Sequence, residues 1–245
     1  FAHQEVITET PSNELDGKIF RRYSVDIDSG TGKTIHQGVM PEEKIIILMQ
    51  YALELLNDGS VPLLIRVSIF HYFFAYIHPF YDGNGRTNRF ISSYLLSKEL
   101  DPLISYHLAR TIQQNISKYY KSFDYTNDIN NRGDLTGFIT NFLEIILESV
   151  ESLNDSLEEK INHLHYFEEI LLSDFKDKTD YGILHLLLQN SLFGLEPLSA
   201  RKISEVLDKY YVTINNRLKK DSIKTLLRSD IPHKYDLDLD MLKTL

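Results

Sequence analysis

The strongest constraint on the fold is an apolar run at residues 61–77, which reads VPLLIRVSIFHYFFAYI. It is shorter than the roughly 20 residues that a membrane span needs, and it contains Pro62, Arg66 and His71. Pro79 disfavours the helical conformation at the residue before it, so a helix that begins near Pro62 has to end by His78. The run is therefore expected to form a buried core helix, and no membrane is expected among the partners.

The composition is that of a soluble globular protein with room for one or two domains. The 245 residues are 42% hydrophobic and 25% charged, and their formal net charge is −9. This acidity argues against binding of nucleic acid or anionic lipid across the whole surface. The absence of cysteine excludes disulfides, thiolate metal sites and a cysteine nucleophile, and it fits a cytoplasmic protein. The N-terminus lacks the basic and apolar regions of a secretory signal.

Apolar residues recur mainly at helical spacing along the rest of the chain, so the predicted fold class is mainly α. Alternating residues on both sides of a turn at residues 29–32 predict a β-hairpin within residues 23–39. A proline followed by two glutamates predicts a helix that begins at Pro41 and ends at Asn57. Further helices are expected over residues 85–100, 108–123, 135–147 and 151–175.

A polar stretch at residues 173–180 divides the chain, and the region that follows has a different character. Residues 181–245 carry a formal charge of +2, which leaves −11 on the remainder. Three helices and a tail with weak strand tendency are expected there, in an order that resembles a winged helix-turn-helix domain. The predicted segments are a helix at 181–189, a helix after Pro197 that is capped by Ser199, a helix at 212–221, and a tail with Pro232 at its tip.

The segment that carries chemistry is residues 78–89, which read HPFYDGNGRTNR. A helix ends at a histidine, a loop holds one carboxylate and two glycines around an asparagine, and a new helix starts with two arginines. The glycines permit backbone N–H groups to turn inward as a nest, and the helix N-terminus adds its positive end. Arg86 and Arg89 lie three apart on one helix face and can hold successive phosphates of one chain.

Asp82 and His78 add two further functions to this anion site. A carboxylate beside a polyphosphate is a natural Mg²⁺ ligand, because magnesium combines one or two carboxylates with phosphates and waters. A histidine titrates near neutrality and can take a proton from an attacking hydroxyl. Each residue alone is more often a helix end, an ordinary turn or a surface charge, so the prediction depends on their combination.

Together these residues match the signature H-x-F-x-[D/E]-G-N-G-R-x-x-R at every specified position, and the chain resembles the Fic (filamentation induced by cAMP) family. The resemblance extends to the preceding core helix and to Lys118-Tyr119-Tyr120, which is similar to a tyrosine pair downstream of the motif. The hairpin lies where Fic proteins have a "flap" that pins the target. A C-terminal winged helix is common in one large bacterial branch.

The resemblance implies a Fic-type helical core with a small β-hairpin flap, followed by a C-terminal winged helix-turn-helix domain. The expected parts are an N-terminal segment at 1–17, a Fic catalytic domain at 18–150 with its flap at 23–39, a bridging helix and linker at 151–180, and a winged helix-like domain at 181–245.

The activity implied by the resemblance is that of a protein adenylyltransferase, which transfers AMP from ATP to a Ser, Thr or Tyr hydroxyl of a target protein. His78 would be the general base, and Asp82 would hold a Mg²⁺ that bridges the α- and β-phosphates. Phe80 would anchor the loop in the core. The phosphate oxygens would be bound by Gly83, Asn84, Gly85, Arg86 and Arg89, with Arg86 on the β-phosphate and Arg89 on the γ-phosphate.

The flap would bind an extended target segment by strand addition, through the backbone groups of Thr34, Ile35, His36, Gln37 and Gly38. This mode of recognition uses the backbone, so the sequence does not indicate which protein is the target.

The chain departs from the family pattern at two places. Asn88 stands where many relatives have glycine. Residues 12–17, SNELDG, resemble the inhibitory motif [S/T]-x-x-x-E-[G/N] of autoinhibited members, with Asp16 in place of the glutamate. The alternative for residues 16–21 is a loop that leads into the flap. Removal of AMP from a modified protein would need the missing glutamate, and phosphate transfer is not expected because relatives that carry it out have lysine at the position of Gly85.

The competing class of function is a DNA-binding regulator in which the Fic core senses nucleotide. Arg217, Lys219 and Lys220 on the predicted recognition helix could contact DNA. The same basic face could instead pack within its domain or in a homodimer, and the sequence leaves both alternatives open.

Overall fold

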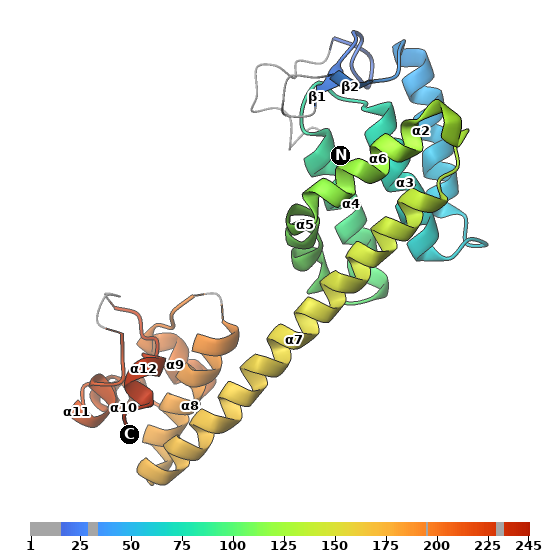
Figure 1. Cartoon of the computed structure of the whole chain (residues 1–245). Coiled ribbons are helices and arrows are strands. Elements are labelled where there is room, and N and C mark those ends of the chain that lie inside the picture. Colours follow the sequence, from blue (N-terminus) through green and yellow to red (C-terminus); the bar gives the residue numbers. More distant parts are fainter. Residues whose placement is uncertain (1–15, 29–33, 195, 229–232) are drawn as a thin grey trace. The chain divides into compact units, whose positions relative to one another are not determined.

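The computed structural model describes residues 16–28, 34–194, 196–228 and 233–245. The chain divides into two compact units, Phe1–Leu153 and Asn154–Leu245, and the long helix α7 (Thr136–Asp174) contributes to both (Figure 1). The fold is mainly helical, as predicted. No described helix is both long enough and apolar enough to cross a membrane.

The first unit contains a pair of short strands and a set of helices that surround α3. Its elements are β1 (Asp26–Asp28), β2 (Thr34–Gln37), α2 (Glu42–Asn57), α3 (Leu63–Ile77), α4 (Asn84–Glu99), α5 (Ile104–Gln114), α6 (Ile116–Asn127), a short 3₁₀ helix η2 (Ile129–Asn131) and the first part of α7.

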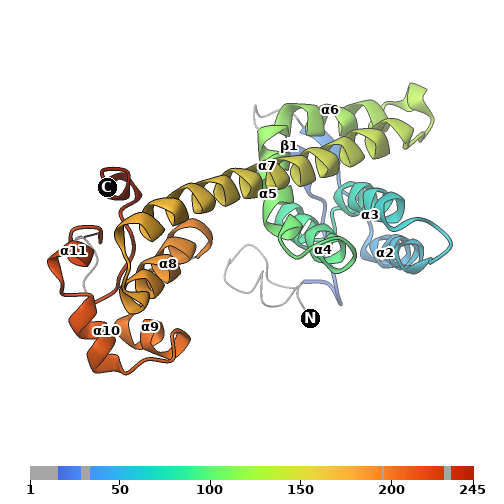
Figure 2. The same cartoon turned by 90° about the horizontal axis from the view of Figure 1, so that it is seen from below.

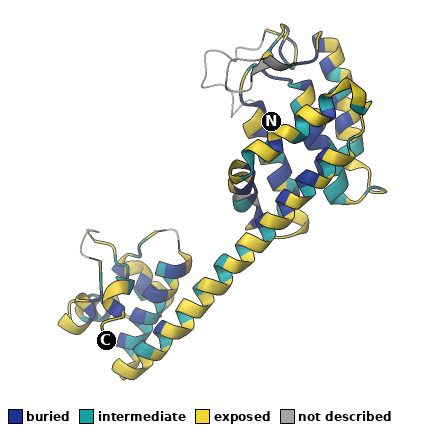
Figure 3. Ribbon diagram, viewed as in Figure 1, coloured by how far each residue is buried: buried dark blue, intermediate teal, exposed yellow. Residues whose placement is uncertain are grey.

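Helix α3 is the centre of the first unit because it is apolar on nearly every side. Val67 and Tyr72 pack into a cluster built with residues of α4, α5, α6 and α7. Phe70, Phe74 and Ile77 pack into a second cluster with α2 and the loop after α3. Figure 3 shows these buried residues gathered inside the unit. Since full burial of one such side chain contributes about 1.5–3 kcal/mol, α3 is held firmly from two sides.

The strands β1 and β2 pair antiparallel, with Asp26 opposite Gln37 and Ile27 opposite His36. A bulge between Ile27 and Asp28 interrupts the register. The turn predicted at residues 29–32 lies outside the described residues, and so do the side chains of Thr34 and Ile35. The strand pair therefore lies in the region where the flap was predicted.

Two predicted helix boundaries in the first unit are wrong. The helix expected over residues 108–123 is divided into α5 and α6 at Asn115, whose φ of −101° and ψ of 20° leave the α-helical range. The helices expected at 135–147 and 151–175 are one continuous helix, α7. Residues 148–150 read Glu-Ser-Val and contain neither glycine nor proline, so nothing in them stops the helix. Helix α6 lies alongside the first part of α7 (Figure 2), where Lys118 pairs with Glu144.

The second unit consists of the last part of α7 and a group of short helices. Its elements are α8 (Lys178–Phe193), α9 (Ala200–Val206), α10 (Tyr211–Arg217), α11 (Asp221–Lys224) and α12 (Leu239–Leu242). Ser199 accepts a hydrogen bond from the backbone of Lys202 at 3.2 Å, so the predicted N-cap is confirmed.

The helix expected over residues 212–221 is interrupted, because α10 ends at Arg217 and α11 begins at Asp221. Lys219 and Lys220 therefore lie in the turn between two short helices. The described part of the tail forms isolated bridges, Leu198 with Tyr235 and Leu227 with Leu237. The tip at Pro232 lies outside the described residues, and the winged helix stays a prediction.

A buried carboxylate organises this second unit. Asp180 is 6% exposed, and it accepts hydrogen bonds from Arg217 at 2.9 Å and from Lys220 at 2.6 Å. Arg217 also pairs with Asp177 at 3.0 Å. The start of α8 is thus tied to the end of α10 and the following turn, and two of the three predicted DNA contacts already serve packing within the unit.

We predict that Asp180→Ala lowers the free energy of unfolding of the second unit by about 1–3 kcal/mol, because two cations lose a buried partner. Amide hydrogen exchange in α8 and α10, measured by mass spectrometry, should become correspondingly faster. Asp174→Ala is the control, because Asp174 is an exposed aspartate at the end of α7 and should change stability by less than about 0.5 kcal/mol. Equal exchange in the two variants would contradict the role given to Asp180.

Candidate active site

The loop between α3 and α4 is shaped by residues at its two ends. His78 ends α3 in a left-handed conformation with a φ of 53°, and Pro79 follows it. Phe80 is 7% exposed and turns inward against Phe20 and Phe74. The side chain of Asn84 bonds both to the N–H of Phe80 at 3.0 Å and to its carbonyl at 2.7 Å. The asparagine of the motif therefore braces the loop with its side chain.

Gly83 starts α4 in a left-handed conformation with a φ of 80°, which a side chain would strain. Its N–H donates to Asp82 at 2.6 Å, so this N–H is not turned toward a ligand as predicted. The N–H groups of Asn84, Gly85 and Arg86 follow in the first helical turn, where no carbonyl of the same helix is available to them. Of the predicted phosphate-binding residues at this turn, Asn84, Gly85 and Arg86 keep such an N–H group, and the anion site itself stays a prediction.

The two motif arginines have different surroundings. Arg86 is exposed and pairs with Asp82 at 3.1 Å. Arg89 is half-buried, and it lines both a cavity beside His78 and a separate hollow along α4. Arg86, Phe90 and Tyr94 lie along that second hollow. Both cations are therefore at the start of α4, but only Arg89 reaches the cavity that contains His78.

The hydrogen bond of His78 determines which of its ring nitrogens can act as a base. Nδ1 lies 3.3 Å from the carbonyl of Ala75, and a carbonyl can only accept, so Nδ1 carries the proton. Nε2 therefore has a free lone pair. Burial lowers the pKa of His78 to about 4, with smaller contributions in the same direction from Arg21 and His36. The imidazole is accordingly neutral and competent to accept a proton at physiological pH.

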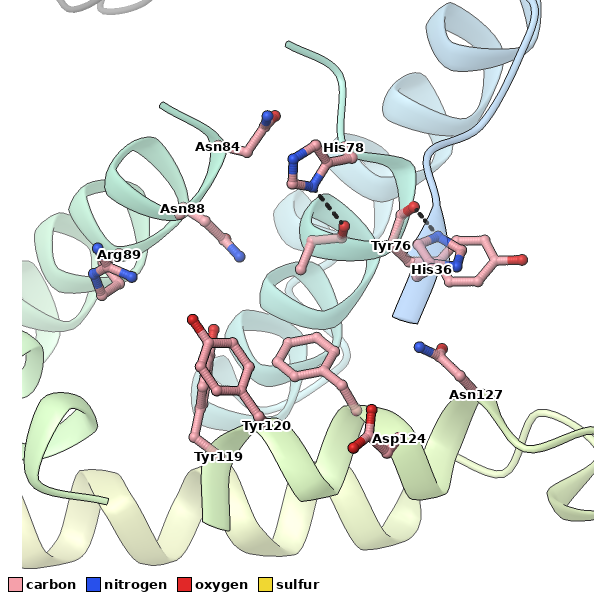
Figure 4. A pocket seen from close by; sticks show the side chains of 13 residues that line it. His36, Tyr76, His78, Asn84, Asn88, Arg89, Tyr119, Tyr120, Asp124 and Asn127 are labelled. Carbon is pink, nitrogen blue, oxygen red and sulfur yellow. Dashed lines mark hydrogen bonds between the residues drawn. The ribbon is translucent and has the colours of Figure 1, made fainter. Parts of the chain in front are cut away.

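The cavity beside His78 has a volume of about 230 Å³ and lies between β2, the end of α3, the start of α4 and one side of α6 (Figure 4). Figure 4 shows His78, Asn88 and Arg89 on one side and Tyr119, Tyr120 and Asp124 on the other. The lining residues are His36, Ala75, Tyr76, His78, Asn84, Gly85, Asn88, Arg89, Tyr119, Tyr120, Phe123, Asp124 and Asn127.

A buried polar group supports the wall of this cavity. His71 is 0% exposed, and its two ring nitrogens lie 2.8 Å from Ser92 and 2.8 Å from the hydroxyl of Tyr119. Asn88 donates to the carbonyl of His71 at 2.8 Å, which explains why a side chain is accommodated where many relatives have glycine. Burial lowers the pKa of His71 to about 3, with a smaller effect of Arg89 in the same direction, so His71 stays neutral.

The predicted flap residues do not all face a target. His36 lies 2.8 Å from the carbonyl of Tyr76, stacks on its ring and lines the cavity. Gly38 is buried, and its N–H donates to Val25 at 2.9 Å. Gln37 is exposed and donates to Asp26. Among the residues predicted to bind the target, Gln37 is thus the one whose described side chain is exposed.

Asp16 is placed in a loop at the base of the flap. It accepts hydrogen bonds from the N–H of Arg22 at 3.0 Å and from the hydroxyl of Tyr81 at 2.6 Å. These contacts favour the loop interpretation of residues 16–21 over the inhibitory motif. Arg217, Lys219 and Lys220 belong to the second unit.

Sequence reasoning missed several residues that build the site. Arg21 is buried against the end of α3, His71 supports Tyr119, and Asn127 and Asp124 line the far part of the cavity. A signal existed for His71, which is a polar residue inside the apolar run, and for Tyr119, which belongs to the tyrosine pair. Arg21 lies in a short loop with no periodicity, so nothing in the sequence marked it.

Comparisons with known proteins bear on the family and on the fold. The sequence model of the Fic/DOC family matches residues 2–96, a range that contains the flap region and the whole 78–89 motif. The predicted resemblance to the Fic family is thereby confirmed for the part of the chain that carries the site. Proteins of this family commonly transfer AMP or other nucleotide groups to proteins.

A solved structure shows a similar fold over nearly the whole chain. It is a Fic family protein from Desulfovibrio desulfuricans G20, with a TM-score of 0.57 and 21% sequence identity, and the match covers 97% of this chain and 67% of that chain. At this level of identity the likeness concerns the fold.

The two buried histidines predict how stability depends on pH. Between pH 6.5 and 5 the unfolded chain binds a proton at each of His71 and His78, whereas the folded chain does not. The free energy of unfolding should therefore fall by about 1.6 kcal/mol per histidine over this interval.

Urea unfolding at pH 6.5 and pH 5, followed by circular dichroism, measures this difference. His78→Gln should lose about half of the expected pH dependence, whereas His165→Gln, at an exposed position of α7, should keep all of it. The same dependence in both variants would mean that His78 is protonated in the folded protein at pH 5.

Proposed function

We propose that this protein transfers AMP from ATP to a hydroxyl side chain of a target protein. The observation that carries the proposal is the arrangement around His78. Its unprotonated Nε2 belongs to a cavity that Arg89, the first turn of α4 and the strand β2 also line. A base, an anion site and an unpaired strand edge in one place are the three parts that protein adenylylation needs.

The reaction would need one proton transfer and one displacement. His78 Nε2 takes the proton from the target hydroxyl, and the hydroxyl oxygen forms a bond to the α-phosphorus of ATP. The bond from the α-phosphorus to the bridging oxygen breaks, and pyrophosphate leaves. The free N–H groups of the first turn of α4 and the guanidinium groups of Arg86 and Arg89 are positioned to bind the phosphate oxygens. Catalysis would thus rest on positioning and charge stabilisation.

The residues present fit a magnesium ion bound together with the nucleotide. Asp82 offers a half-exposed carboxylate at the start of the anion site, and one carboxylate with phosphates and waters is a usual magnesium shell. Among the described residues no group of three or more acidic or histidine side chains could hold a metal without the nucleotide. The ion would neutralise charge on the departing pyrophosphate. Asp82 would exchange its contact with Arg86 for this role.

The low pKa of His78 also fits a base that is activated by its substrate. In the ligand-free protein burial is the main cause of this low pKa, and the positive charge of Arg21 lowers it further. A bound triphosphate places several negative charges in the same cavity, which raises the pKa of a neighbouring histidine. His78 would then approach the basicity at which general-base catalysis is efficient.

The target would be bound at the free edge of β2. In the described part of the chain this strand pairs only with β1, so its other edge is available to an extended segment. This edge lies beside His36, which lines the cavity. A hydroxyl on the bound segment could therefore reach His78, and the contacts would be mainly with the backbone.

We predict that the protein becomes labelled, or labels a protein in a lysate, when it is incubated with Mg²⁺ and α-labelled ATP. His78→Ala should reduce this labelling by at least about 100-fold, because the general base is lost. His165→Ala is a matched control at an exposed position of the second unit and should label as the wild type does. Gel autoradiography and mass spectrometry of the product measure the outcome.

The same assay separates the alternatives. Labelling from γ-labelled ATP instead of α-labelled ATP would mean transfer of phosphate. Loss of label from an already modified protein would mean removal of AMP. Labelling by His78→Ala at the wild-type level would overturn the role proposed for the histidine. No observation favours the DNA-binding alternative, since Arg217 and Lys220 are engaged by Asp180.

A further inference from the structure

We propose that Arg21 is a positioning residue that holds the His78 turn and both ends of the flap in a single arrangement, and so fixes the place from which His78 acts. Its part in the reaction rests on the proposed function, whereas its part in the geometry does not. Arg21 is 2% exposed and is among the largest fully buried side chains of the described chain.

Every polar group of the Arg21 side chain donates to a backbone carbonyl. Nε donates to His78 at 2.7 Å, and Nη1 donates to Tyr23 at 2.6 Å. Nη2 donates to Val39 at 2.8 Å and to Ile77 at 3.3 Å. Tyr23 precedes β1 and Val39 follows β2, so one guanidinium group joins both ends of the flap to the last residues of α3.

The end of α3 needs these donors. The last carbonyls of a helix have no partner within the helix, and a cation there is stabilised by the helix dipole. The carbonyl of Ile77 accepts from the Val39 N–H at 3.1 Å as well as from Arg21, and the carbonyl of Pro79 accepts from the Arg21 N–H at 3.1 Å. Residues 21 and 39 therefore satisfy three consecutive carbonyls of the turn in which His78 adopts its left-handed conformation.

Arg21 has no carboxylate partner among the residues that the structure describes, which is unusual for a buried guanidinium. Burial accordingly lowers the pKa of Arg21, although the side chain stays charged. A charge buried without a counter-ion costs free energy, and four carbonyls in a fixed fork offset that cost only if all of them are in place. The group thus favours one arrangement of the turn and the flap over looser ones.

The arrangement around Arg21 requires a residue without a side chain at position 38. A Cβ atom at Gly38 would lie 2.3 Å from Nη2 of Arg21 and 3.2 Å from Cβ of His78. The flap backbone can approach the guanidinium closely only because position 38 has no side chain. Gly38, which was predicted to bind the target, is therefore explained by Arg21 and His78.

Apart from Tyr76, Tyr119 and Tyr120 in the cavity wall, the charged and titratable groups around His78 come from four elements. Arg21 lies in the loop before β1, His36 lies on β2, and Arg89 and Asp124 line the cavity from α4 and α6. Arg21 is the one that touches the His78 backbone. Removing it would both withdraw a positive charge and loosen the turn that buries the imidazole, and both changes raise the pKa of His78.

The test is an NMR titration of the His78 side chain in the full chain, assigned by its loss in His78→Asn. We expect a midpoint near pH 4 in the wild type, a midpoint shifted toward 6.5 in Arg21→Met, and an intermediate value in Arg21→Lys, which keeps the charge but not the fork. Arg22→Met changes the neighbouring exposed arginine and should leave the midpoint unchanged.

Gly38→Ala keeps every charge and crowds the guanidinium at 2.3 Å more severely than Cβ of His78 at 3.2 Å, so it is the second variant if Arg21→Met does not fold. It should shift the midpoint in the same direction as Arg21→Met. In the transfer assay with α-labelled ATP, kcat should fall about 10- to 100-fold in the folded Arg21 variants with KM for ATP changed less than about threefold, as expected for misplacement of a base.

A folded Arg21→Met or Gly38→Ala variant with an unchanged His78 midpoint would overturn the proposal. The titration uses no nucleotide, so it decides the role of Arg21 even if the wild-type protein transfers no AMP. Absence of transfer by the wild type would overturn the proposed function alone.

Discussion

Three backbone carbonyls at the end of α3 hold the site together. Those of Ile77, His78 and Pro79 are all satisfied by groups of Arg21 and Val39, which lie on either side of the flap. A helix end that is buried without partners would be unstable, so the flap and α3 depend on each other. Because α3 is itself fixed by two apolar clusters, the turn that carries His78 is held from both the helix and the flap.

This constraint explains how a weakly basic side chain can be placed for catalysis. His78 donates from Nδ1 to the turn before it, and its Nε2 remains free beside the cavity. The opposite wall is held by a second buried group, in which His71 positions Tyr119. Both histidines are kept neutral by burial, so the cavity offers polar groups but little positive charge except Arg89. An anionic ligand would bring negative charge into the cavity and so raise the pKa of His78.

The motif and the core helix could be predicted from the sequence because their residues are adjacent in the chain and their chemistry is local. Pro79 predicted that α3 ends by His78, and the helix ends at Ile77. Phe80 was predicted to anchor the loop in the core, and it is buried. Arg21 could not be found, since its role depends on carbonyls more than 50 residues away that only the fold brings close. The continuity of α7 was missed because its apolar stripe weakens near Ser149, where packing and not periodicity continues the helix.

A crystal structure of the protein with Mg²⁺ and the non-hydrolysable analogue α,β-methylene-ATP would test the central claim most directly. We expect the α-phosphorus to face Nε2 of His78 and the β- and γ-phosphates to lie against the start of α4 and Arg89. The nucleoside should fill the cavity toward Tyr120 and Asn127. A nucleotide bound outside this cavity, or one whose α-phosphorus lies away from His78, would contradict it.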